Sequence, residues 1–458
     1  MEVSGRDRLT LLAIVMLPML VWWAAFYPGT FTNDSLTVIN QIRSGNWDDW
    51  HTNAYTAFVW LTSLSGNYWA MTTLAQVALM SLGIASLATA FIKQGIPRTI
   101  VLIASALFAA SPQVGAFAIT LWKDVPSAAG ALMLAASMVN LRPSDRSKAE
   151  AFMLLAGGAL LVGSFRWNGP VALVIISVIL VVLYRKQVLR ATAVILGMGI
   201  VSMASLILPQ RLNLAASTAS TIVNVTELHD IAYAYTSDQS SIDESGKSLL
   251  GSIMPLENWL RGGSTCETVD VLLFENIDEF APQSREAIHE RRGKLRNLWL
   301  SVIRNSPSEV ATTRFCRAAG VWSPLYFGKQ PTLGLAYLHS NDPELGRPGY
   351  FPSLERMAIR AVTMTSSSEL RKSLALNAML WTLIAIAVVF ALRNRPVARL
   401  YLKCLPVSIA VMVSVMLGAV AHDARYVASA LLLAQFFVAV AVLDSIRHRI
   451  SVTRSRRA

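Results

Sequence analysis

Near its N-terminus the chain carries the sequence LTLLAIVMLPMLVWWAAF at residues 9–26, a run without a charged side chain. An apolar run of this length can cross the hydrocarbon core of a bilayer as one α-helix. It must be helical there, because lipid offers no hydrogen-bond partner to an exposed backbone. No small-residue cleavage site follows the run, so we expect a retained anchor rather than a signal peptide.

Further apolar runs follow, and together they predict an all-α polytopic membrane protein with about ten transmembrane helices. These runs cover residues 68–92, 99–119, 125–141, 149–165, 171–184, 189–208, 374–392, 402–420 and 426–443. The composition agrees with this fold class, because 54% of the 458 residues are hydrophobic and 15% are charged. Soluble domains, in comparison, carry roughly 25% charged residues.

Lysine and arginine are distributed unequally between the two sides that these runs define. The loops on the side of the N-terminus are rich in both residues, whereas the opposite short loops hold Arg43, Lys123, Arg166 and Arg425. Basic loops stay in the cytoplasm, which places both termini inside. The net charge of +12 is explained by these loops rather than by nucleic-acid binding. We therefore expect a multi-pass protein of the plasma (inner) membrane.

A long polar segment divides the membrane part into two. The predicted division is an N-terminal membrane domain, an extracytoplasmic domain and a C-terminal membrane domain with a basic tail, at residues 1–209, 210–373 and 374–458. Within the polar segment, apolar residues at helical spacing predict a helix at 284–305. Gly, Pro and aromatic residues at 320–352 predict a loop. Cys266 and Cys316 could pair if this segment lies outside the cytoplasm.

The loop after the first apolar run, FTNDSLTVINQIRSGNWDDWHTNAYT at residues 31–56, concentrates chemically versatile side chains. It contains Asp34, Asp48, Asp49 and His51 together with two tryptophans. Carboxylates, an imidazole and indoles at a membrane surface are suited to chemistry on a sugar or a phosphate. The plainer interpretation is a solvated loop whose tryptophans lie at the membrane interface.

Three short turns on the same side of the membrane also carry charge. They are LWKDVP at 121–126, RWNGP at 166–170 and HDARY at 422–426. Their cations Lys123, Arg166 and Arg425 would lie beside helix N-termini, which favour anions, so a phosphate leaving group would be stabilised there. Alternatively, Asp124 only caps its helix, and the arginines snorkel or pair with carboxylates.

Taken together, these motifs resemble the GT-C superfamily of membrane glycosyltransferases, and especially bacterial members with a WKD-x-P turn and a late Asp-x-Arg-Tyr. The matching residues are Tyr27-Pro28-Gly29, Asn33-Asp34-Ser35, Trp50-His51, Trp122-Lys123-Asp124, Arg166-Trp167-Asn168-Gly169 and Asp423-Ala424-Arg425-Tyr426. The resemblance covers the membrane portion, and Thr52 stands where close relatives often have proline. It implies a sugar donor carried on a polyprenyl phosphate or diphosphate, and an acceptor outside the cytoplasm.

The resemblance also implies roles for individual residues. Asp34 matches the carboxylate that serves as base or metal ligand in the superfamily. An acceptor hydroxyl needs such a base as it attacks the anomeric carbon, and direct displacement assisted by one base inverts that centre. Lys123, Arg166 and Arg425 would stabilise the departing lipid phosphate. We expect supporting roles for Asn33, Asp49, His51, Asp124, Asn168, Asp423 and Tyr426.

The expected partners are a polyprenyl-phosphate sugar donor, membrane lipids, and an extracytoplasmic glycan, lipid or protein as acceptor. Asp34, Asp48 and His51 could also bind Mg or Mn, although the adjacent Asp48 and Asp49 point in different directions in regular structure. Three other histidines lack ligand spacing and are expected at the surface, namely His229, His289 and His339.

Two other functions fit the same composition. A transporter or lipid flippase would line a pathway with the ionisable residues, but such groups usually lie near the bilayer midplane in broken helices. Here they fall at helix ends on one side. A non-catalytic envelope-assembly protein would use residues 210–373 to bind a wall component. Loss of activity on changing Asp34 would distinguish the enzyme from this assembly protein.

Overall fold

The computed structural model describes residues 3–140, 148–184, 189–215, 225–273, 282–324, 345, 350–365, 367–418 and 423–455. These residues are largely helical and form no strand beyond an isolated bridge between Thr30 and Thr120. The helices of the membrane part are α1 (Gly5–Ala25), α4 (Trp69–Lys93), α5 (Arg98–Ala110), α6 (Pro112–Ile119), α7 (Asp124–Asn140), α8 (Lys148–Ser164), α9 (Gly169–Tyr184), α10 (Leu189–Arg211), α21 (Glu369–Leu376), α22 (Ala378–Ala391), α23 (Pro396–Gly418) and α24 (Ala428–Ser455).

Each predicted apolar run coincides with a helix or a pair of helices, but fewer of them qualify as membrane spans. By length and composition, 5 described helices can cross a membrane, namely α1, α4, α10, α23 and the helix that includes α24. The number rises to 7 if the bent pairs α5–α6 and α21–α22 each form one span. The expectation of ten spans is therefore not confirmed. Helices of 16 or 17 residues, such as α7, α8 and α9, reach about 25 Å, less than the hydrocarbon thickness of about 30 Å.

Helix α7 forms the centre of the bundle, since every residue from Asp124 to Val139 is buried. It packs closely against α8 through glycines. A Cβ atom at Gly130 would lie 2.8 Å from the carbonyl oxygen of Gly158, and one at Gly158 would lie 2.6 Å from that of Gly130. Contact through small residues is typical of membrane helices. This packing fixes the start of α7, where Lys123 and Asp124 lie.

The segment 31–56 folds into two helices, α2 (Asn33–Ser44) and the start of α3 (Asn53–Thr62), so the expectation of a loop was wrong. A capping box starts α2, in which the backbone N–H of Thr32 donates to Ser35 Oγ at 2.9 Å. Gly45 ends the helix with φ of 71°, a left-handed conformation that glycine adopts at little cost. The Asn-Asp-Ser sequence therefore begins a helix.

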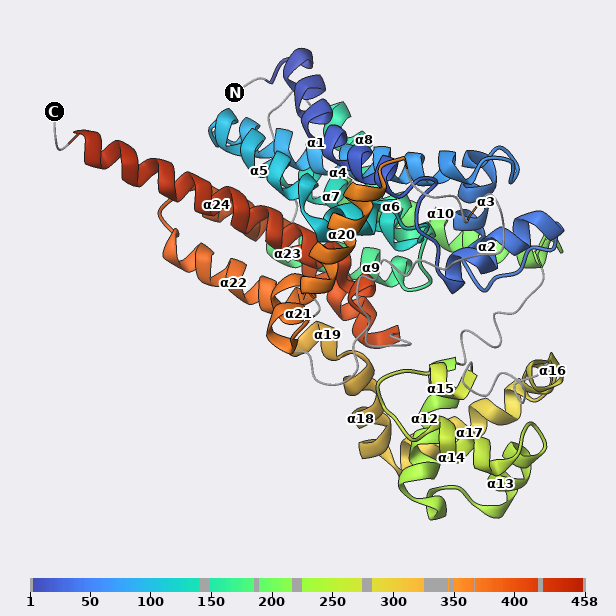
Figure 1. The fold of residues 1–458 in the computed structure, drawn as a ribbon. Helices are drawn as coiled ribbons and strands as arrows, with labels where there is room; N and C mark the ends of the chain where they lie inside the picture. Colours follow the sequence, from blue (N-terminus) through green and yellow to red (C-terminus); the bar gives the residue numbers. More distant parts are fainter. Residues whose placement is uncertain are drawn as a thin grey trace.

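The polar segment forms a separate helical unit below the membrane bundle in Figure 1. Its helices are α12 (Val225–Ser237), η2 (Gln239–Ser241), α13 (Glu244–Gly251), α14 (Leu256–Gly262), α15 (Asp270–Leu273), α16 (Pro282–Glu290), α17 (Arg292–Asn305) and α18 (Pro307–Arg317). The short helix α19 (Ala319–Trp322) follows and packs against α22 and α23 of the membrane part. It has its own apolar core around the fully buried Trp259. A further helix, α20 (Pro352–Thr365), lies against the membrane bundle and contacts α1 and α6.

One expectation for this polar unit changes in detail and a second, the cysteine pair, is confirmed. The helix predicted at 284–305 is two helices, α16 and α17, which are separated at Arg291. Cys266 and Cys316 form a disulfide, with Cα atoms 5.7 Å apart. The loop predicted at 320–352 lies for the most part outside the described residues.

A buried charge cluster joins α12 to α18. Asp230 is completely buried and accepts hydrogen bonds from arginines of α18, with Arg317 Nη2 at 2.8 Å. His229 beside it is also buried and contacts the guanidinium of Arg317, so the expectation of a surface position was wrong. This face of α12 is turned into the core of the unit. His289 is exposed as expected, and His339 lies outside the described residues.

Candidate functional site

Four segments distant in the sequence meet at the end of the bundle where α2, α7 and α9 begin. Their side chains include Asp34 at the start of α2, His51 before α3, Lys123 and Asp124 at the start of α7, Arg166 before α9, and Asp423 and Arg425 at η3 (Ala424–Val427). We call these seven residues the charged cluster. The charged turns distinguished in the sequence thus lie side by side.

Short polar contacts tie the start of α2 to the turn before α7. The hydroxyls of Thr30 and Thr120 lie 2.7 Å apart. Ser35 Oγ donates to the carbonyl oxygen of Leu121 at 2.9 Å, and the indole N–H of Trp122 donates to a hydroxyl of the α2 cap at 2.8 Å. Because these contacts are buried or half-buried, they hold Asp34 and Lys123 in a fixed relation.

Arg425 lies at the centre of the charged cluster. Its Nη1 donates to Asp34 Oδ2 at 2.5 Å, and its Nε lies 2.9 Å from Asp423 Oδ2. Its guanidinium stands over the ring of Trp122, 5.3 Å from the centroid, an arrangement favourable to a cation. The side chain is 16% exposed. The carboxylates of Asp34 and Asp423 and the ring of Trp122 therefore hold this cation in place.

Arg166 belongs to the same cluster but contacts Asp124 and Tyr426 rather than Asp34. Its Nη1 lies 3.2 Å from Asp124 Oδ1 and donates to the carbonyl oxygen of Tyr426 at 2.7 Å. The amide of Asn168, in the same turn, donates to Ser414 Oγ at 3.0 Å. Asp124 is 2% exposed, so its charge needs a partner. The half-buried Arg166 from a neighbouring turn supplies it.

His51 bridges Asp34 and Lys123 as a neutral imidazole. Its Nε2 lies 3.0 Å from the backbone carbonyl oxygen of Asp34, and its Nδ1 lies 3.3 Å from Lys123 Nζ. A carbonyl only accepts and an ammonium only donates, so the proton must be on Nε2. Burial, reinforced by the charge of Lys123, lowers the pKa of His51 to about 3. This histidine therefore positions its neighbours and does not carry charge near neutral pH.

The carboxyl of Asp34 is the accessible acid of the cluster. Its side chain is 32% exposed, compared with 2% for Asp124 and 13% for Asp423. Burial alone would raise the pKa of Asp34, but the charges of Arg425 and Lys123 outweigh it and hold that pKa well below its usual range. Asp34 is thus ionised and reachable from outside the cluster.

Three other predicted residues of the opening segment lie away from this carboxyl. Asn33 is the exposed first residue of α2. Asp48 accepts from the amide of Gln41 at 2.5 Å, and Gln41 lies about 10 Å along α2 from Asp34 by helical rise. Asp49 is buried and accepts from Gln210 at 3.4 Å. Of the supporting residues on this segment, it is His51 whose side chain joins the charged cluster.

The proposed metal ligands do not come together. Both ring nitrogens of His51 already have partners, and Asp48 faces Gln41 rather than Asp34. Among the described residues, no group of three His, Cys, Asp or Glu side chains has an arrangement that could hold a metal ion. The residues present therefore do not fit a site for Mg or Mn built from Asp34, Asp48 and His51.

Tyr55 belongs to this site, but the sequence motifs did not indicate it. Its ring lies 6.2 Å from that of His51, one helical turn earlier, and its buried hydroxyl has no hydrogen-bond partner. Burial, reinforced by the charges of Asp124 and Asp34, raises the pKa of this hydroxyl. The spacing of four residues from His51 was the available signal. Tyr55 is therefore a neutral donor at the back of the site.

Comparison with known proteins adds little to this geometry. No family model matches the chain, and no curated protein matches it. Among solved structures, the chain is similar to ArnT from Cupriavidus metallidurans, crystallised with undecaprenyl phosphate bound. The sequence identity is 13% and the TM-score is 0.36, and the match covers 97% of this chain and 79% of ArnT. Likeness of this degree carries no argument about function.

Proposed function

We propose that this chain is a GT-C type glycosyltransferase of the plasma membrane. It transfers a sugar from a polyprenyl-phosphate-linked donor to an extracytoplasmic glycan, lipid or protein, with inversion at the anomeric carbon. The observation that carries the proposal is the convergence of one accessible carboxylate, Asp34, with Lys123 and Arg425. Charged groups at membrane helices are costly and mark functional sites. The motif resemblance supplies the class of reaction.

In this mechanism Asp34 accepts the proton of the acceptor hydroxyl as the oxygen attacks the anomeric carbon. The bond from that carbon to the lipid phosphate breaks, and the phosphate leaves with its negative charge. Arg425 and Lys123 lie next to Asp34, so they stabilise this charge. Arg166 contributes positive charge from behind Tyr426.

In the structure Arg425 is paired with Asp34. The mechanism requires that donor binding weaken this pair. A carboxylate held by a guanidinium is a weak base. A donor phosphate competes for Arg425, because phosphate and carboxylate fit the same planar fork. When Arg425 turns to the phosphate, the pKa of Asp34 rises, since the cation that lowered it is shared. The donor thereby activates the base that the acceptor needs.

The test is transfer of radiolabelled sugar from a polyprenyl-phosphate donor by purified protein in lipid. Asp34→Asn keeps the shape and removes the base, so transfer should fall roughly 10²–10⁴-fold while donor binding survives. Asp34→Glu should recover little, because a displaced carboxylate misses the hydroxyl. Asp48→Asn is the matched control on the same segment and should cost less. Near-normal transfer by Asp34→Asn would mean that the base lies elsewhere.

No specific observation favours a transporter. Most of the described ion pairs of the membrane part lie at helix ends, with the charged cluster at one end and Arg8 and Lys93 paired with Glu150 at the other; Arg395 pairs with Asp444 inside α24. A transport pathway would instead place its ionisable groups near the bilayer midplane. An enzyme working on a substrate that approaches along one membrane surface needs the observed arrangement.

A further inference from the structure

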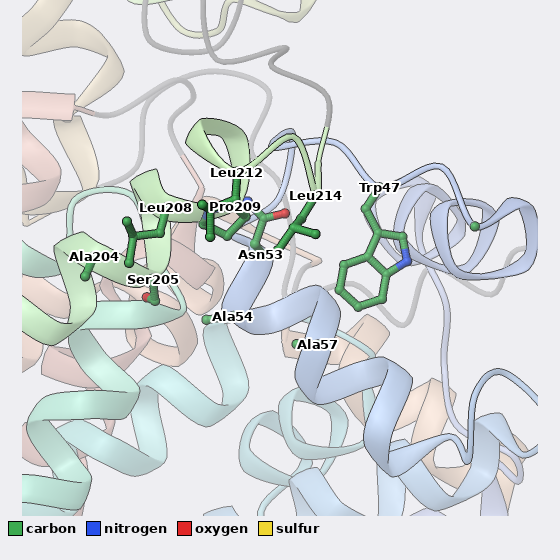
Figure 2. A pocket seen from close by; sticks show the side chains of 11 residues that line it. Trp47, Asn53, Ala54, Ala57, Ala204, Ser205, Leu208, Pro209, Leu212 and Leu214 are labelled. Carbon is green, nitrogen blue, oxygen red and sulfur yellow. The ribbon is translucent and has the colours of Figure 1, made fainter.

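A pocket separate from the charged cluster lies between α3 and the C-terminal part of α10 (Figure 2). It encloses about 610 Å³, a volume typical of sites for small ligands. Its walls are almost entirely apolar, and include Trp47, Ala54 and Ala57 on one side and Ala204, Leu208 and Leu212 on the other. A wall of this composition suits a hydrocarbon chain.

The pocket adjoins the part of α10 that faces lipid. The wall residue Leu208 of α10 is 51% exposed, and Leu212 and Leu214, which directly follow this helix, are 62% and 69% exposed. One turn or two earlier on the same helix, Ile200 and Met203 are also exposed. Large apolar side chains exposed on an apolar helix mark the surface that lipid covers. A hydrocarbon chain can therefore enter the pocket sideways from the bilayer.

One polar side chain in this wall lacks a partner. Asn53 is 5% exposed, it lines the pocket, and neither its Oδ1 nor its Nδ2 makes a hydrogen bond (Figure 2). The neighbouring Thr52 Oγ1 is also buried without a partner. Buried polar groups are almost always hydrogen-bonded, and a side-chain amide both donates and accepts. The pocket therefore offers a place for a ligand group with both abilities, such as an amide or a hydroxyl.

The pocket is connected to the charged cluster through the chain. His51, whose ring meets Asp34 and Lys123, precedes Asn53 by two residues, or about 7 Å of chain. On the α10 side, Gln210 follows the pocket residue Pro209 and donates to Asp49. A lipid seated in the pocket would thus lie beside the segment that carries His51.

We infer that this pocket binds a hydrocarbon chain of the acceptor, and that the acceptor is a lipid carrying an amide or hydroxyl group on that chain. The inference rests on the proposed function and names its acceptor class. A polyprenyl chain is a plain hydrocarbon, so in this pocket it would leave Asn53 unpaired. The pocket accordingly suits the acceptor, while the donor phosphate belongs to the charged cluster.

The first experiment maps lipid sites on the full chain in lipid nanodiscs with two photoreactive probes. One is a lipid with an amide-linked acyl chain, and the other is a polyprenyl phosphate. The amide-linked probe should label peptides containing residues 45–57 and 204–214. Ala57→Phe fills the pocket and should abolish this labelling. Val201→Phe introduces the same side chain on the lipid-facing side of α10, where Val201 is 47% exposed, and should leave labelling unchanged.

The second experiment tests the role of the amide. Asn53→Leu should weaken binding of the amide-linked lipid roughly threefold to tenfold, the effect of one lost hydrogen bond. A matched lipid without an amide or hydroxyl should bind this variant at least as well as the wild type. A misfolded variant would lose both lipids, so the opposite responses identify recognition by the side chain.

Three results would overturn the inference. The polyprenyl phosphate could label this pocket in place of the amide-linked lipid, neither probe could label it, or Asn53→Leu could weaken both lipids equally. None of these results would contradict the proposed glycosyltransferase activity, which is tested by a separate measurement. That measurement is sugar transfer from polyprenyl-phosphate donors by the wild-type protein, and absence of transfer from every donor would contradict the proposed activity.

Discussion

At the scale of single residues, the contact between Arg425 and Asp34 determines how the candidate base ionises. The guanidinium lowers the pKa of Asp34 against the effect of burial. The carboxylate therefore stays ionised as the pH falls through the mildly acidic range. Arg425→Gln removes the cation and leaves the burial, so the pKa should rise. The acid limb of the pH profile of kcat/KM should then move to higher pH, and the rate should fall about 10²–10³-fold.

Arg166→Gln is the control for this prediction. Its guanidinium meets Asp124 rather than Asp34, so the variant should lower the rate without moving the acid limb. The measurement is transfer of labelled sugar by the purified variants over a pH series. If the limb stays in place in Arg425→Gln, the ionisation of Asp34 is set by something other than this contact.

The positions of the three candidate metal ligands lead to a prediction about metal dependence. Asp34, Asp48 and His51 do not converge, and the ring nitrogens of His51 are engaged by a carbonyl and a lysine. We therefore predict that transfer by protein treated with EDTA proceeds at the untreated rate. Restoration of a lost rate by added Mg or Mn, and not by Ca, would show instead that a metal acts at other residues.

At the scale of elements, the disulfide holds α18 to the loop before α15. Cys266 and Cys316 are 50 residues apart in the sequence, and a cross-link closing a loop of this size stabilises a fold by about 2–5 kcal/mol. Cys316→Ser should thus make the polar unit unfold at a lower denaturant concentration. Alkylation followed by peptide mass analysis should label both cysteines after reduction only. Labelling without reductant would contradict the disulfide.

Cys404 is the internal control for that experiment. It is buried in α23 and lies outside the disulfide. It should react with the alkylating reagent in denatured protein whether or not reductant is present. A reductant-dependent reaction of Cys404 would point to disulfide exchange during preparation rather than to the pairing of Cys266 with Cys316.

The membrane helices could be predicted from the sequence, whereas the fold of the segment 31–56 could not. The apolar runs predicted the helices of the membrane part, because a long apolar run forms a helix in lipid whichever segments pack against it. The segment 31–56 could not be read in this way, since α2 depends on a capping box with serine at its third position and on contacts with the distant turn at Leu121. The site motifs were recognisable, but the pairing of Arg425 with Asp34 spans 391 positions and no local pattern encodes it.

At the scale of the whole molecule, the placement of the polar unit decides whether the chemistry is possible. The charged cluster, the pocket and the polar unit must all face the compartment of the acceptor. Trp50, from the opening segment, packs against the core of the polar unit, so the two belong on one side of the membrane. A disulfide in that unit suits an oxidising compartment, and the basic loops suit the cytoplasm.

This placement predicts the outcome of reporter fusions along the chain. Reporters inserted near residues 145, 187 and 396 should be active as cytoplasmic fusions, because these loops are rich in lysine and arginine. Those near residues 45, 250 and 423 should be active outside. An enzyme that meets a lipid-linked donor at the outer surface needs Asp34 and residues 225–324 in that compartment. If a fusion near residue 250 proves cytoplasmic, every residue of the charged cluster faces the wrong side, and neither the proposed transfer nor the acceptor pocket can stand.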